Sequence, residues 1–161
     1  MKSLTEQASA TALRVITSLR GAVVHWVYSS GCMVDDRVII ANEFALQLKV
    51  GHWILLRVRR METTLGNDYY QFIATDESTI PGIAMESGIM LHPFVQVRLC
   101  WPNEVVTRAY FNQAEEQSFE SGLVYEKTLV LATSLGRVFK FEPEETIAER
   151  IKLHLPPLPR E

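Results

Sequence analysis

Residues 48–58 read LKVGHWILLRV, a turn at Gly51 followed by a long apolar segment. Successive side chains of a β-strand point to opposite faces, so this segment divides into two sets of residues. One face then carries His52, Ile54, Leu56 and Val58, and the other carries Trp53, Leu55, Arg57 and Arg59. The first set predicts a core face. The second set combines an aromatic ring with two guanidinium groups, which makes it a candidate binding surface.

Segments with the same β-type composition lie on both sides of this stretch. β-branched and aromatic residues gather at 22–28, 33–34, 38–40, 69–74, 94–100, 105–111, 123–125, 128–133 and 137–141. Gly136 stands in the turn between the last two segments, where a positive φ is expected. An acidic polar stretch at 112–120 is expected to separate two of the segments. The chain is therefore predicted to be mainly β.

Helices are predicted at the two ends of the chain. Residues 3–20 carry apolar residues at three- and four-residue steps, begin with a capping-box pattern and stop at Gly21. Near the other end, Pro143 followed by two glutamates is typical of the first turn of a helix. Ile147, Ile151 and Leu155 recur at four-residue steps. They predict a short C-terminal helix that ends at Pro156.

Residues 20–75 follow a recognisable order. A glycine-opened strand at 21–28, a small turn at 29–31 and a strand around 35–40 precede the step from Leu48 to Ile54. In this order the segment resembles the small OB barrels of the cold-shock-like group, where a similar Leu-Lys-Val-Gly turn starts the third strand. The resemblance covers about a third of the chain and implies an OB-like barrel. Residues 38–40 are aliphatic where that family carries aromatic residues that stack bases.

The predicted architecture is mainly β, with OB-like small barrels between an N-terminal and a short C-terminal helix. The expected regions are an amphipathic helix at 1–20, an OB-like β barrel at 21–75, a connection at 76–93, a second β subdomain at 94–142, and a C-terminal helix with a proline tail at 143–161. The connection keeps enough apolar residues to pack against the core. One domain and two fused barrels both fit this pattern.

Charge is divided unevenly along the chain. The 161 residues are 47% hydrophobic, enough for a core, and have a formal net charge of -3. Acids and bases balance in residues 1–80, whereas acids are in excess in residues 81–161. Within 37–60 the bases outnumber the acids by four. We therefore expect any nucleic-acid surface to lie in the first half.

Six residues are the candidate binding residues: Trp53, Arg57, Arg59, Lys49, Tyr70 and Trp26. Exposed aromatic rings beside arginine are typical of hot spots in protein interfaces. An aromatic platform on a basic face is also how OB folds hold single strands. We expect a non-catalytic binding module or adaptor subunit of a larger complex; single-stranded RNA or DNA binding is the alternative. Trp101, at a bend, fits either a core plug or an exposed anchor.

Catalytic and metal-binding patterns are missing from the sequence. It has no GxSxG, P-loop or HExxH motif, and its four histidines are scattered singly. We therefore expect no enzyme activity, cofactor or metal. The two cysteines, Cys32 and Cys100, form no disulfide framework, which favours an intracellular location in the cytoplasm or nucleus. No apolar run approaches the roughly 20 residues of a membrane span, so no membrane partner is expected.

Overall fold

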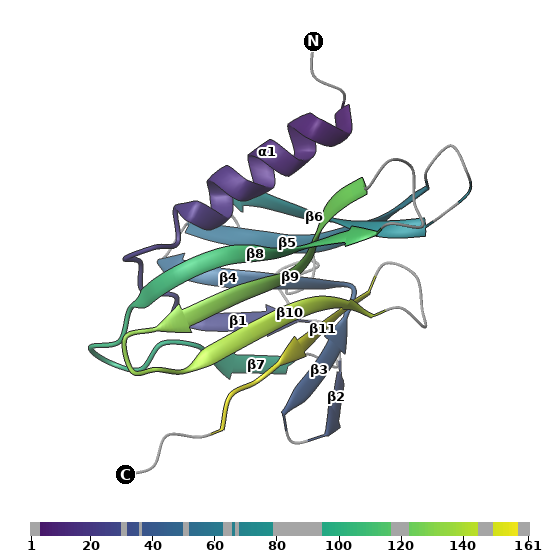
Figure 1. Ribbon diagram of the computed structural model, residues 1–161. Coiled ribbons are helices and arrows are strands. Elements are labelled where there is room, and N and C mark those ends of the chain that lie inside the picture. The colour runs from purple at the N-terminus through teal and green to yellow at the C-terminus, as the bar shows by residue number, and fades with distance from the viewer. Residues whose placement is uncertain are drawn as a thin grey trace.

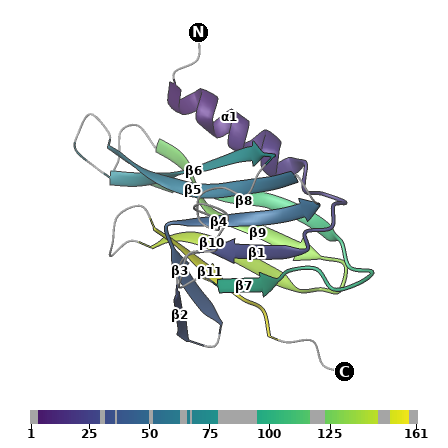
Figure 2. The same cartoon turned by 180° about the vertical axis from the view of Figure 1, so that it is seen from behind.

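Two antiparallel sheets make up most of the computed structural model (Figures 1 and 2). The structure describes residues 4–29, 32–35, 37–49, 52–62, 66, 68–78, 95–116, 123–144 and 150–157. One sheet has five strands in the order β6 (Asp68–Glu77), β5 (His52–Glu62), β4 (Glu43–Lys49), β1 (Trp26–Ser29) and β7 (Val95–Arg98). The other has six, in the order β2 (Cys32–Asp35), β3 (Val38–Ala41), β11 (Arg150–His154), β10 (Val138–Glu144), β9 (Leu123–Thr133) and β8 (Val106–Glu116). The mainly β class is confirmed.

The two sheets pack face to face around one core. Phe44 of β4 meets Phe141 of β10 edge-on, with ring centroids 5.5 Å apart. Three of the four residues predicted for the core face of β5, Ile54, Leu56 and Val58, are buried in the same cluster as these two rings. The fourth, His52, is partly exposed, and its Nε2 lies 3.1 Å from Oδ1 of Asp76. Side chains from both sheets and from the N-terminal helix belong to this single cluster.

Helix α1 (Leu4–Thr17) confirms the N-terminal prediction and covers one long edge of the sandwich. It packs against β6 and β8, the strands that end the two sheets on that side (Figure 1). Its buried residues are Ala12, Val15 and Ile16, with Leu19 just beyond its end. This three- and four-residue spacing places one apolar stripe on the core. Gly21 follows with a φ of 81°, the left-handed conformation expected after a helix.

The predicted C-terminal helix is wrong. Residues 150–154 form strand β11, which pairs with β10 on one side and with β3 on the other. Ile151 and Leu153 are buried, and the residues between them are partly exposed, so the local period is two rather than 3.6. Pro143 likewise lies within strand β10. Four-residue spacing of three aliphatic residues was too short a signal to exclude a strand.

The predicted boundaries do not follow the sheets. Strand β7, expected in the second subdomain, pairs with β1, and β3 of the first pairs with β11 of the last region. The acidic stretch at 112–120, expected to separate two segments, overlaps strand β8, which continues to Glu116. Residues 79–94, which hold most of the expected connection, lie outside the described residues. The OB-like resemblance of residues 20–75 stays a prediction.

Candidate functional site

Trp53 does not form the exposed platform that the strand pattern suggested. It lies on the predicted face of β5 but is only 4% exposed. It packs with Ala45 and Leu55, and its ring centroid lies 5.3 Å from that of Tyr28. A buried indole has no open face on which a base or a partner side chain can stack. Trp53 is therefore a packed residue.

Arg57 and Arg59 share the predicted outer face of the five-stranded sheet and are exposed. Arg57 stands opposite Glu43 in the β4–β5 register. Burial raises the pKa of the Glu43 carboxyl, and the nearby Arg57 offsets part of that rise. Arg59 donates a 2.8 Å hydrogen bond from Nη2 to Oε1 of Gln71. The side chain of Lys49 lies outside the described residues.

Tyr70 and Trp26 lie on opposite faces of the five-stranded sheet. Tyr70 packs against the core cluster, on the inner face. Trp26 lies opposite Arg98 of β7, and the guanidinium of Arg98 sits 5.2 Å from the centroid of its ring. The five predicted residues whose side chains the structure describes therefore do not form one site. Trp26 alone points to the region around β7, where a different group of residues converges.

The turn after β7 presents Trp101. This side chain is 40% exposed, which supports the anchor interpretation over the core plug. The Trp101 N–H donates to Oε1 of Glu104 at 2.8 Å, and the Glu104 N–H donates to the Trp101 carbonyl at 3.0 Å. Asn103 closes the turn with a φ of 68°, a conformation that asparagine tolerates better than most residues. These hydrogen bonds fix the backbone of the turn from which the indole projects.

Beneath this turn lies what we call the Glu104 cluster: Glu104, Thr133 and Arg137. The Glu104 side chain is 0% exposed. It accepts hydrogen bonds from the Thr133 hydroxyl, from Arg137 Nε at 3.0 Å and from Arg137 Nη2 at 2.7 Å. Arg137 Nη2 also donates to the carbonyl of Leu99. A buried carboxylate with this many donors is fully compensated, as a buried charge must be.

The pKa of Glu104 reflects two opposing effects. Burial raises the pKa of its carboxyl, because the charged form loses water. Hydrogen bonds from Arg137, Thr133 and the Trp101 N–H favour the charged form and outweigh burial. The pKa of the Glu104 carboxyl therefore lies below its ordinary value.

Rings and guanidinium groups alternate above this cluster. Arg98 lies 5.2 Å from the ring centroid of Trp26 and 5.7 Å from that of Trp101. Arg137 lies 5.9 Å from the ring centroid of Trp101 and 5.3 Å from that of Phe139. These distances are within the range of cation–π attraction. We call this series, from Trp26 to Phe139, the cation–π stack.

A groove of about 820 Å³ opens beside the stack. Residues 96–98 of β7 form one wall, and residues 155–157, which follow β11, form the other. Trp101, Arg137 and Phe139 lie between them, together with Arg37. Three of the lining residues are arginines, and none of the described lining residues carries a carboxylate. The groove is therefore a positively charged surface with apolar and aromatic walls.

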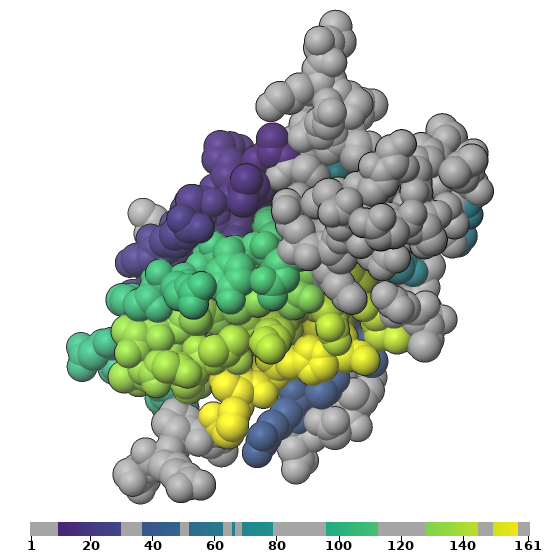
Figure 3. Space-filling view, viewed as in Figure 1, coloured from purple at the N-terminus to yellow at the C-terminus, as the bar shows by residue number. Residues whose placement is uncertain are grey.

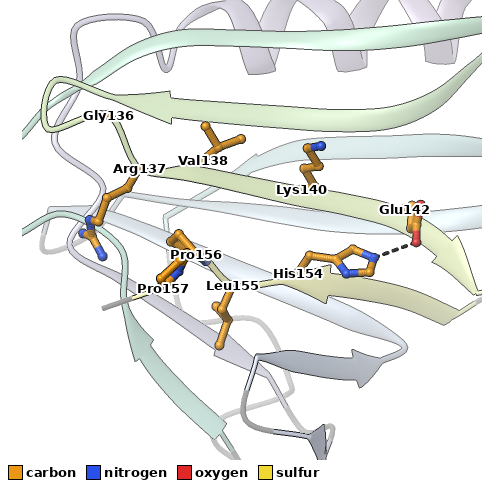
Figure 4. Close-up of a pocket in the computed structure, with 9 residues that line it drawn as sticks. All are labelled: Gly136, Arg137, Val138, Lys140, Glu142, His154, Leu155, Pro156 and Pro157. Atoms are coloured by element: carbon orange, nitrogen blue, oxygen red, sulfur yellow. Dashed lines mark hydrogen bonds and ion pairs between the residues drawn. The ribbon is translucent and has the colours of Figure 1, made fainter. Parts of the chain in front are cut away.

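A second hollow, of about 700 Å³, lies on the other side of residues 155–157. Figure 4 shows Val138, Lys140, Glu142 and His154 around it. His154 Nε2 and Glu142 Oε1 are 2.6 Å apart. In Figure 3 the described end of the chain, in yellow, lies between the yellow-green strands of the six-stranded sheet and the blue of β3. It thus separates the two hollows, and Lys140 adds a further cation on this side.

Basic groups of the groove come mostly from the second half of the chain. Arg98 and Arg137 belong to the second half of the chain, whose overall charge is acidic, and Arg37 belongs to the first. The expectation that any nucleic-acid surface lies in the first half stays a prediction. The charge of Arg137 is matched by the buried Glu104, so this pair adds little to the field at the surface.

The described residues contain no group of three or more residues that could hold a metal ion. Among them, no helical segment combines the length and the apolar character of a bilayer span. The chain matches no protein-family model, and neither the curated proteins nor the solved structures contain a significant match to it. The groove is therefore interpreted from its own geometry.

Sequence reasoning missed Arg98, Glu104 and Arg137. The Trp101-Pro102-Asn103 bend was a usable signal, and Glu104 follows directly after it. The partner of Glu104 lies 33 residues further along the chain, so no local pattern could connect them. Arg98 reaches Trp26 only because β7 pairs with β1.

Proposed function

We propose that the protein is a non-catalytic binding module that engages a partner protein through the groove beside β7, with Trp101 as the anchor. The observation that supports this proposal is a large exposed aromatic side chain fixed from below by buried, fully hydrogen-bonded groups. Trp101 is 40% exposed, whereas Glu104, which bonds to its backbone, is not exposed at all. As an adaptor subunit, the module would contribute no reacting groups of its own.

Preorganisation is the physical reason why such a residue makes a good anchor. Tryptophan and arginine are enriched among the residues that dominate binding energy at protein interfaces. The guanidinium groups of Arg98 and Arg137 already contact the Trp101 ring, at 5.7 and 5.9 Å from its centroid. Binding would therefore cost little side-chain entropy, which is one of the main terms opposing association.

The test compares two exposed apolar residues on opposite edges of the sandwich. The tagged wild-type chain, Trp101→Ala and Leu13→Ala are each used to capture partners from cells that express the protein. Leu13 lies on helix α1 and is 52% exposed. We expect a partner that is captured by the wild type and by Leu13→Ala but lost with Trp101→Ala. A partner that stays with Trp101→Ala, with circular dichroism showing both variants folded, would contradict the proposal.

Single-stranded nucleic acid is a second candidate, because three arginines and an exposed indole line the same groove. Such binding weakens steeply as salt is raised, since bound cations are released from the phosphates. Binding of labelled oligo(dT) and oligo(U) across a salt series tests this candidate. Loss of binding with Arg98→Ala would assign it to the groove, and loss with Arg57→Ala plus Arg59→Ala would assign it to the outer face of β5. No binding at low salt would exclude both surfaces.

A further inference from the structure

We propose that the groove beside β7 receives an extended, acidic segment of the partner protein, which pairs with β7 as an additional strand of the five-stranded sheet. The inference rests on the function proposed above and specifies how the partner is recognised. Backbone hydrogen bonds supply the affinity in this mode of binding, and pockets for alternate side chains supply the specificity.

Strand β7 lies at the end of the five-stranded sheet. Among the described residues, β1 is the strand that pairs with it, and no strand pairs with its second edge (Figure 2). An edge strand presents a row of backbone N–H and C=O groups to any chain that comes alongside. Gln96–Arg98 line the groove, so this edge opens into it. The four residues of β7 offer a length of about 13 Å for pairing.

The opposite wall of the groove, at residues 155–157, has no backbone N–H left for an incoming segment. Pro156 and Pro157 have no backbone N–H, and the N–H of Leu155 is already donated to the carbonyl of Arg37 at 2.7 Å. A segment that enters the groove can therefore exchange N–H and C=O hydrogen bonds with β7, while the far wall offers it van der Waals contact. Val97 and Leu155, which are partly exposed, provide apolar surface for every second side chain of that segment.

The described charged side chains that line the groove are all arginines. Arg37, Arg98 and Arg137 line the groove, and none of its described lining residues is acidic. The charge of Arg137 is matched by Glu104. Arg98, in contrast, uses only Nε among the described residues, donating to the carbonyl of Cys100 at 3.0 Å. Its two terminal amino groups remain for a ligand, and a carboxylate is the group that a guanidinium fork binds best.

The same geometry favours a peptide over a nucleic acid. Bases bind single-strand sites by stacking on open aromatic faces. Two guanidinium groups already lie over the Trp101 ring and one lies over the Trp26 ring. Less ring surface is therefore left for a base to stack on. The backbone N–H and C=O groups of β7 match the regular hydrogen-bonding groups of a polypeptide, which a nucleic acid lacks.

The experiment selects phage-displayed random short peptides on the wild-type protein, after peptides that bind Trp101→Ala have been removed. We expect the selected peptides to be rich in Asp and Glu and to lack proline in their central positions. One of them is then synthesised twice, once unmodified and once with alternate backbone amides N-methylated. Methylation should abolish binding in fluorescence polarisation. Arg98→Gln should weaken binding about tenfold, the loss of one charged hydrogen bond.

Arg14→Gln, which removes an exposed arginine from helix α1, is the matched control and should bind as the wild type does. Selection of no peptide, of peptides without acidic residues, or of peptides that tolerate N-methylation would overturn the inference. Tighter binding of oligo(dT) in the groove would identify a nucleic acid as the occupant, and a dimer joined through β7 in sedimentation would identify a second copy. If the natural partner is nevertheless lost with Trp101→Ala, the proposed function stands and only strand addition fails.

Discussion

The two long edges of this sandwich are closed in opposite ways. Helix α1 seals the gap along β6 and β8 with an apolar stripe that is almost completely buried. At the other edge, β7 and residues 155–157 leave a groove between them, supported by the Glu104 cluster and the cation–π stack. The comparison shows that the covered edge is built for stability, whereas the open edge combines charged and aromatic groups at some energetic cost. Such an arrangement is expected where a surface binds something.

The largest predicted effect removes the charge on which the open edge depends. Glu104→Gln should lower the free energy of unfolding by about 3–5 kcal/mol, because it leaves the mostly buried Arg137 without its counter-charge. Urea denaturation measures this loss. Glu62→Gln, a change at an exposed glutamate, serves as control and should stay within about 0.5 kcal/mol of the wild type. An equally small effect of Glu104→Gln would show that the Glu104 cluster is dispensable.

The covered edge is tested by Ile16→Ala. Ile16 is fully buried under α1, and its truncation should cost about 3 kcal/mol through lost transfer energy and a cavity. Leu13→Ala, on the exposed side of the same helix, should cost far less. Both variants should bind the partner of the groove with wild-type affinity at temperatures where they remain folded. Weaker partner binding by folded Ile16→Ala would mean that the two edges are coupled.

Acid should weaken the open edge by a smaller amount than mutation does. The pKa of Glu104 is lower in the folded chain than its ordinary value of 4.5, so the unfolded state binds the proton more readily. The stabilisation is therefore fully present above pH 4.5 and is lost as the pH falls through the folded-state pKa. As the pH is lowered over this range, the midpoint temperature of thermal unfolding should fall more steeply for the wild type than for Glu104→Gln. Parallel pH profiles would contradict the assignment.

How much of this was predictable from sequence depends on how far apart the contacting residues are. The alternation of Ile54, Leu56 and Val58 and the helix before Gly21 are local patterns, and both are confirmed. Strand β11 was mistaken for a helix because its pairing with β3 joins residues more than a hundred positions apart. The face of Trp53 was predicted correctly, yet its burial depends on packing that a strand pattern does not encode.

The candidate site shows the same limit more sharply. The sequence left Trp101 open between a core plug and an exposed anchor, and it marked Trp26 as a candidate binding residue. Their connection through Arg98 exists only because β7, far along the chain, pairs with β1. The Glu104–Arg137 pair likewise joins two turns from different strand pairs.

The smallest predicted effect separates binding from stability. Trp101→Ala should lower the free energy of unfolding by only about 1 kcal/mol, because the indole is largely exposed and its cation–π contacts are weak in water. The same variant should lose the partner. Urea denaturation combined with a binding assay makes the distinction. A loss of stability as large as that of Glu104→Gln would show that Trp101 is a structural residue rather than an anchor.

Hydrogen exchange of the wild-type chain, with and without its captured partner, tests the central claim most directly because it reads both edges in one experiment. The account predicts slower exchange of backbone amides in residues 95–104, which include β7 and the Trp101 turn, and no change in helix α1. Slower exchange confined to α1, with β7 unchanged, would show that the covered edge is the binding surface and would contradict the account.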